Sequence, residues 1–243
     1  MKIAVISPKC VQESAKYIAE QLKLWYDDVT YYNPYQQQAP KSFDLVVNYG
    51  CSSSVPLCKR INDVYPVATA IDKLATFTKI PKELRVVWTS KKEQAKKWIM
   101  DGHHVAIRET AIGTQGKGLS ITNKIEDIDN KPAVFYTKYV HHTNELRINC
   151  FKNKVLTVLD KQDVFGNFLF KLLRKFEHPQ LQTLVDTIYT NIGLDMYGID
   201  ALLDNNGNLV MLEVNSGPML FGQTGIQMVQ AIHKEIEDVS SRR

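Results

Sequence analysis

The sequence has few cysteines, no long apolar run and little charge imbalance. Its four cysteines form no C-x-x-C pair, so neither a zinc site nor a disulfide framework is indicated. No apolar run approaches the roughly 20 residues that a membrane helix needs, and the first residues predict a short strand and not a signal peptide. These absences lead us to expect a reduced, cytoplasmic setting and no membrane partner.

The net charge of +4 over 243 residues is mild. It suits an anionic ligand such as a nucleotide, but no aromatic-plus-basic surface motif accompanies it, so a nucleic-acid partner is not expected. The hydrophobic content of 44% is ordinary for a globular protein of one or two compact units.

The first third of the chain alternates strand and helix patterns. Residues 3–6, 29–32 and 44–49 are typical of strands, and residues 11–25 carry apolar side chains at helical spacing. This order predicts a small parallel sheet flanked by helices. Residues 50–54 follow a strand directly, which is the usual place for ligand contacts in such sheets.

From about residue 66 the pattern changes to α+β with mostly antiparallel strands. Ser90 and Glu93 form a plausible capping box for a following helix, and Gly193 ends a helix that begins at Pro179. Further helices are expected at 72–78 and 224–238, and strands at 86–88, 104–108, 119–122, 134–140, 146–151 and 155–159.

The sharpest signal is a hairpin near the end of the chain. Asn206-Gly207 between two apolar strands predicts a two-residue type I′ turn. With that loop, Asp200 lies directly opposite Glu213. Because strand side chains alternate, Asn215 shares the face of Glu213.

The two facing carboxylates of this hairpin predict a bound divalent cation. At about 5 Å and an effective dielectric near 20 they repel by roughly 3 kcal/mol, so the pair needs compensation. An all-oxygen set with room for phosphate oxygens suits Mg²⁺. Two alternatives remain open, namely a proton shared between the acids and a turn register that differs by one residue and separates them.

A glycine-rich segment follows the strand that ends at Arg108. Three glycines in six residues let backbone N–H groups approach phosphate oxygens closely, and Arg108 and Lys117 add positive charge. The segment lacks the Gly-Lys-Ser/Thr and following helix of a Walker A loop. A flexible hairpin tip is the alternative. The segment comprises Gly113, Thr114, Gln115, Gly116, Lys117 and Gly118.

A third polar pattern lies around the strand expected at 134–140. The backbone of this strand could face a planar base. Glu145, which follows the strand in the chain, could accept hydrogen bonds from ribose hydroxyls. Arg147 lies two residues on, so it shares that strand face and points toward the phosphates. A surface ion pair between Glu145 and Arg147 is the alternative.

These three patterns, in this order, resemble the ATP-grasp superfamily, in particular the ribosomal-protein glutamate ligases and their glutathione-synthase-like relatives. The resemblance covers roughly residues 44–237 and is carried by the glycine-rich segment, by Gly198-Ile-Asp200, by residues 212–218 and by Asp72-Lys73.

The resemblance implies an α/β and α+β fold in two units. A small N-terminal parallel αβ domain (the pre-ATP-grasp domain) would occupy residues 1–65. A two-lobed ATP-grasp domain with mostly antiparallel sheets would occupy residues 66–243, with a small lobe at about 72–138 and a large lobe at about 139–243.

The resemblance also implies a role for each candidate residue. ATP would be bound by Lys73, Arg108, the glycine-rich segment, Lys138, Tyr139, Val140, Glu145 and Lys161. Two Mg²⁺ ions, for which Mn²⁺ could substitute, would be held by Asp200, Glu213 and Asn215. Arg147 would be the catalytic residue that steadies an acyl phosphate and the tetrahedral intermediate. Arg108 stands where the family usually has lysine, which keeps the charge but changes the fork geometry.

The implied activity is an ADP-forming, Mg²⁺-dependent ligation of a carboxylate to an amine through an acyl phosphate. The partners would be ATP, a carboxylate-bearing amino acid, peptide or protein, and an amine acceptor. A small-molecule kinase and a non-catalytic nucleotide sensor are the alternatives.

Overall fold

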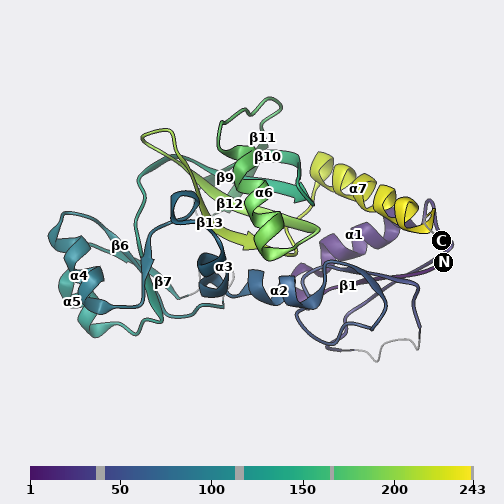
Figure 1. Ribbon diagram of the computed structural model, residues 1–243, viewed down its shortest axis with the longest axis horizontal. Helices are drawn as coiled ribbons and strands as arrows, with labels where there is room; N and C mark the ends of the chain where they lie inside the picture. The colour runs from purple at the N-terminus through teal and green to yellow at the C-terminus, as the bar shows by residue number, and fades with distance from the viewer. Residues whose placement is uncertain (37–41, 113–117, 165–166, 242–243) are drawn as a thin grey trace.

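The computed structural model describes residues 1–36, 42–112, 118–164 and 167–241. Three sheets follow one another along an elongated molecule, and the two chain termini lie side by side at one end (Figure 1). No helix in these ranges is long and apolar enough to span a membrane.

The first sheet is parallel, as predicted, with the order β2-β1-β3-β4. Its strands are β1 (Lys2–Ile6), β2 (Asp28–Tyr32), β3 (Leu45–Asn48) and β4 (Lys59–Ile61), and the helical segments beside it are η1 (Lys9–Val11) and α1 (Gln12–Leu22). The predicted helical spacing is confirmed at Ala15, Ile18 and Leu22, which are fully buried in α1.

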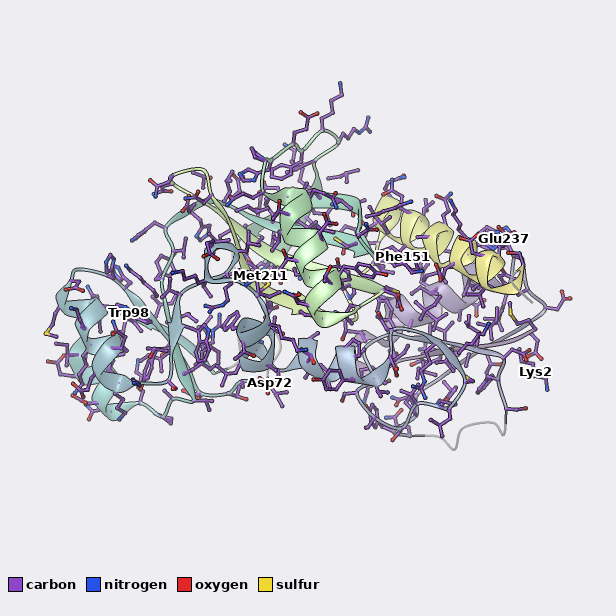
Figure 2. The ribbon with its side chains drawn as sticks, in the orientation of Figure 1. Lys2, Asp72, Trp98, Phe151, Met211 and Glu237 are labelled. Carbon is purple, nitrogen blue, oxygen red and sulfur yellow. The ribbon has the colours of Figure 1, made fainter. Side chains whose placement is uncertain are left out.

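The second sheet is antiparallel, with the order β5-β8-β6-β7. It comprises β5 (Trp88–Thr89), β6 (Val105–Arg108), β7 (Leu119–Thr122) and β8 (Phe135–Lys138), with helices α4 (Lys92–Met100) and α5 (Ile125–Asn130). Trp98 of α4 and Ile128 of α5 pack on Ile107, so the helices cover one face. Figure 2 marks this end of the molecule with Trp98.

The predicted capping box of α4 is wrong. The N-cap residue is Lys91, whose side chain makes no capping bond, and the helix begins at Lys92. Ser90 stands one residue too early, and Thr89 Oγ1 accepts the N–H of Lys91 at 3.1 Å instead.

Two short helices and then one 3-10 turn connect the first sheet to the second. The helices are α2 (Val64–Ile71) and α3 (Lys73–Lys79), and the 3-10 turn is η2 (Lys82–Leu84). Asp72 caps α3, because its carboxylate accepts the N–H groups of Leu74 at 2.8 Å and Ala75 at 3.1 Å. This cap fixes Lys73 as the first residue of α3, and Figure 2 shows Asp72 near the middle of the molecule.

The third sheet has five antiparallel strands in the order β11-β10-β9-β12-β13. They are β9 (His142–Phe151), β10 (Lys154–Val164), β11 (Asn167–Leu172), β12 (Met196–Asp204) and β13 (Leu209–Asn215). Helix α6 (Leu181–Ile192) packs its Leu184 and Ile188 against Ile148 and Ile199 of the sheet. The polar residues of the strands therefore lie on the opposite face.

The last helix, α7 (Gly222–Ser240), packs against α1. Its Ile232 shares an apolar cluster with Ile18 of α1 and with Phe151 and Met196 of the third sheet. Figure 2 shows Phe151 where the third sheet approaches α7. The domain limits at residues 65 and 138 stay predictions.

Candidate functional site

Three neighbouring strands bring the predicted acidic residues together. In β12, Asp200 lies opposite Arg147 of β9 on one side and opposite Glu213 of β13 on the other. Asn215 lies opposite Gly198, two residues along on the same face. The predicted opposition of Asp200 and Glu213 is confirmed.

The turn that joins β12 to β13 differs from the predicted one. Asp204 N–H donates to the Asn208 carbonyl at 2.9 Å, so the loop holds residues 205–207 and not Asn206-Gly207 alone. The carboxylate of Asp204 accepts the N–H groups of Asn206 at 2.9 Å and Asn208 at 2.7 Å, which stabilises this longer loop. The predicted two-residue turn is wrong.

A β-bulge restores the register further along the hairpin. Leu203 pairs with Leu209, whereas the predicted two-residue turn would pair it with Val210. The register then shifts by one residue between Asp200 and Ala201. The extra residue, Leu212, lies on β13, so Asp200 still faces Glu213. The alternative in which a different turn register separates Asp200 from Glu213 is therefore wrong.

Arg147 neutralises Asp200 in a buried ion pair. Its Nη2 donates to Asp200 Oδ2 at 2.9 Å and its Nε donates to Oδ1, and the two side chains are only 12% and 5% exposed. Burial acts to raise the pKa of Asp200, but the charge and hydrogen bonds of Arg147 outweigh it and hold that pKa below its usual value. The alternative of an ion pair between Glu145 and Arg147 is wrong, because Glu145 pairs with Lys161.

Glu213 is less well compensated than Asp200. Lys73 Nζ lies 3.2 Å from its Oε2, and Asn215 Nδ2 reaches both its Oε1 at 3.4 Å and Asp200 Oδ2 at 3.3 Å. Burial and the nearby Asp200 nevertheless raise the pKa of Glu213, although Lys73 acts to lower it. Each carboxylate thus has one cation beside it, and the contact with Asp200 makes the charged form of Glu213 the less favourable of the two.

The donor set fits a divalent cation that also takes oxygen atoms from a bound ligand. Asp200, Glu213 and Asn215 offer two carboxylates and an amide from one sheet face. In the part of the chain that the structure describes, no group of three or more His, Cys, Asp or Glu forms a metal-ligating cluster. A cation here would thus need further oxygens, as Mg²⁺ takes from phosphates.

Arg108 ends β6 with an unsatisfied donor. Its Nε is buried and has no hydrogen-bond partner among the described residues, and its guanidinium lies 5.9 Å from the ring centre of Phe135. Burial lowers the pKa of Arg108, while Glu213 acts in the opposite direction. Buried donors normally have a partner, so this group fits an anion.

The segment that was predicted to face the base of ATP, called the hinge below, joins the second sheet to the third. It consists of Lys138, Tyr139 and Val140. Lys138 N–H donates to the Val87 carbonyl at 2.9 Å, and Tyr139 N–H donates to the His104 carbonyl at 2.9 Å. These bonds tie the start of the connection between β8 and β9 to the segments that precede β5 and β6, the two neighbours of β8.

Most of the glycine-rich segment lies outside the described residues, namely Gly113, Thr114, Gln115, Gly116 and Lys117. Gly118 is described. Its φ is +69°, and its carbonyl accepts the Glu109 N–H at 2.9 Å, so it closes the base of the hairpin between β6 and β7.

Sequence comparisons link the chain to ligases over about half its length. No family model matches it. It is 29% identical over 145 residues to the probable alpha-L-glutamate ligase of Marinomonas sp., covering 51% of this chain and 48% of that protein. It is 32% identical over 127 residues to the probable alpha-L-glutamate ligase of Saccharophagus degradans, covering 45% and 42%. The chain aligns with about half the length of these curated relatives.

Solved structures match the whole architecture. The ATP-grasp ligase PsnB, complexed with minimal precursor, Mg and ADP, has a TM-score of 0.69 at 12% identity, covering 96% of both chains. D-alanyl-alanine synthetase A from Vibrio cholerae has a TM-score of 0.68 at 14% identity, covering 97% of this chain and 93% of that one. The chain has the ATP-grasp fold. The expected fold class is confirmed.

Two residues on the polar face of this ATP-grasp sheet were not predicted from the sequence. Asn149 is fully buried, donates to Thr157 Oγ1 at 3.1 Å, and its Oδ1 has no hydrogen-bond partner in the described chain. Phe170 of β11 lies 5.7 Å from the Arg147 guanidinium. The alternation Glu145-Leu-Arg147-Ile-Asn149 was the signal for the first, whereas β11 itself was not predicted.

Proposed function

We propose that the protein is an ATP-dependent carboxylate–amine ligase that forms an acyl phosphate and releases ADP and phosphate. The observation that carries the proposal is the opposition of the buried Asp200 and the half-buried Glu213, faced by the cations Lys73 and Arg147. The curated relatives named as glutamate ligases and the ATP-grasp ligase solved with Mg and ADP support it.

Asp200, Glu213 and Asn215 would hold Mg²⁺, as two ions, with Mn²⁺ able to substitute. Bound Mg²⁺ supplies charge neutralisation at phosphate oxygens. The pKa of Glu213, raised by burial and by Asp200, supports this assignment, because a cation removes that unfavourable charge.

The nucleotide would lie between the second and third sheets. Lys73 and Arg108, with the glycine-rich segment, would contact its phosphates, and the buried Nε of Arg108 offers a donor that lacks a protein partner in the described chain. The hinge at residues 138–140 would face the adenine. Glu145, which pairs with Lys161, would accept from the ribose hydroxyls.

Arg147 would act on the carbonyl side of the reaction. A guanidinium stabilises the negative charge that develops on an acyl phosphate and on the tetrahedral intermediate. Its two hydrogen bonds to Asp200 and the Phe170 ring beneath it hold the fork beside the acidic pair before substrate arrives. Such preorganisation lowers the cost of reorientation during the reaction.

The test measures ADP release from ATP and Mg²⁺ with pools of amino acids and peptides, and mass spectrometry identifies the product. Asp200→Asn and Glu213→Gln should each lower the rate by at least about 100-fold, as expected for loss of transition-state charge stabilisation. Asp204→Asn is the matched control, because it changes a half-buried acid at the loop end of the same hairpin and should leave the rate unchanged.

Other products would contradict the proposal. Formation of AMP and pyrophosphate, or turnover that persists without a divalent cation, would refute the ligase mechanism. Turnover without an amine that yields a stable phosphorylated product would indicate a small-molecule kinase. Nucleotide binding without turnover would indicate a sensor.

A further inference from the structure

Strand β10 has an open edge at its beginning. It pairs with β9 from Lys154 to Lys161, but with β11 only from Leu159 onward. The Leu173 N–H also donates to the Val158 carbonyl at 2.9 Å, so within the described chain residues 154–157 have a backbone partner on one side only. Such an edge presents backbone N–H and C=O groups with which another extended chain can pair.

A cavity of about 500 Å³ lies along this open edge. Residues 155–158 of β10 form one side, residues 172–174 and Phe176 a second, and Gln223 and Gln227 of α7 a third. The lining combines apolar side chains with about as much polar surface, from amide, hydroxyl and guanidinium groups, which suits a polar ligand such as a peptide. The cavity is large enough for one or two amino-acid residues.

One buried polar atom beside the cavity lacks a partner. Oε1 of Gln227 is buried and accepts no hydrogen bond in the described part of the chain. Gln223 lies four residues earlier, so both amides project from the same side of α7. A buried acceptor without a donor fits a ligand that brings an N–H group, and a peptide backbone supplies one per residue.

The charge of the lining is of one sign. Of the described residues, Arg174 is the only charged one that lines the cavity, and none of them is an acid. Lys171 and Lys175 are exposed on the same segment. The site therefore favours a carboxylate over a cationic group.

A chain of polar contacts connects the cavity to the acidic pair. Thr157 in its wall accepts from Asn149 Nδ2 at 3.1 Å, and Asn149 lies opposite Gly198 of β12, two residues from Asp200. Neighbouring strands are about 4.8 Å apart, so β10 and β12 are separated by about 10 Å. A chain docked on the open side of β10 lies one spacing further out, about 14 Å from β12, and an extended peptide spans that distance with about four residues.

We propose that the open edge of β10 docks an extended, acidic peptide segment of the substrate. The segment pairs with residues 154–157, donates a backbone N–H to Gln227 and places an acidic side chain beside Arg174. This inference rests on the proposed ligase function and narrows its substrate to a polypeptide whose reacting end lies about four residues from the docked segment.

Direct binding tests this proposal without catalysis. The probe is a fluorescein-labelled peptide of about eight residues with alternating valine and glutamate, which matches the face alternation of a strand. Fluorescence anisotropy gives its Kd for the wild type, for Gln223→Trp, which fills the cavity from an exposed position, and for Arg174→Glu. Gln230→Trp is the matched control, because Gln230 is an exposed glutamine of α7 that does not line the cavity.

We expect Gln223→Trp and Arg174→Glu each to raise the Kd by at least about tenfold, a change typical of one lost anchoring contact. Gln230→Trp should leave it unchanged, and a lysine-for-glutamate probe should bind at least about tenfold more weakly. Equal binding of both probes, an unchanged Kd in Gln223→Trp, or displacement of the probe by free glutamate would overturn the proposal. Binding as expected without ADP release for any acceptor would refute the ligase function and leave the docking site standing.

Discussion

Replacement of Arg147 by methionine isolates the electrostatics of the site. Methionine keeps much of the side-chain volume but removes the guanidinium, which leaves Asp200 buried beside Glu213 without its counter-charge. We expect the free energy of unfolding to fall by about 3–5 kcal/mol, the usual cost of breaking a buried pair by removing one partner. Repulsion between two carboxylates about 5 Å apart, roughly 3 kcal/mol at a dielectric near 20, accounts for much of it.

The assay is urea and thermal unfolding of Arg147→Met, Asp200→Asn and the double variant. For a chain of this length about 1 kcal/mol shifts the Tm by roughly 2–4 °C, so the single Arg147 variant should melt about 6–20 °C below the wild type. The double variant should recover at least about 2 kcal/mol of the loss, because the neutral amide no longer needs a counter-charge. Adding about 10 mM Mg²⁺ should raise the Tm of Arg147→Met more than that of the wild type, since the cation takes the place of the guanidinium.

Two results would refute this reasoning. A loss below about 1 kcal/mol in Arg147→Met would mean that Asp200 is not held in a buried ion pair, since exposed pairs contribute no more than that. Strictly additive losses in the double variant would mean that Arg147 and Asp200 are not coupled.

Two other perturbations test neighbouring features. Burial and Asp200 raise the pKa of Glu213, so the charged form of Glu213 lowers the stability of the protein above that pKa. Glu213→Gln should therefore be at least as stable as the wild type at pH 8, and any advantage should vanish as the pH falls toward about 4. Urea unfolding over this pH range measures the difference. A methyl group on Gly198 would lie 2.9 Å from Pro218 Cβ and 3.2 Å from Arg147 Cδ, so Gly198→Ala should lower the free energy of unfolding by about 1–3 kcal/mol. The loss should be smaller when Gly198→Ala is made in a Pro218→Gly background, which removes that Cβ; an equal loss in both backgrounds would contradict the contact.

Local patterns predicted most of the secondary structure. Alternating polarity gave the faces of β9 correctly, and Gly193, with its φ of +85°, ends α6 at the residue predicted. The errors also had local causes. The carboxylate of Asp204 favoured a longer turn than the one that Asn206-Gly207 prefers, and β11 was missed.

The sequence by itself determined which side chains share a strand face, because a period of two is a property of the backbone alone. It therefore gave the grouping of Glu145 with Arg147 and of Glu213 with Asn215. Only the tertiary structure decided that Arg147 neutralises Asp200, 53 residues away, and that Lys73 reaches Glu213 from α3. Which strands become neighbours depends on how the whole chain buries its apolar faces, and the bulge that brings Asp200 back opposite Glu213 forms only once β12 and β13 are packed in that sheet.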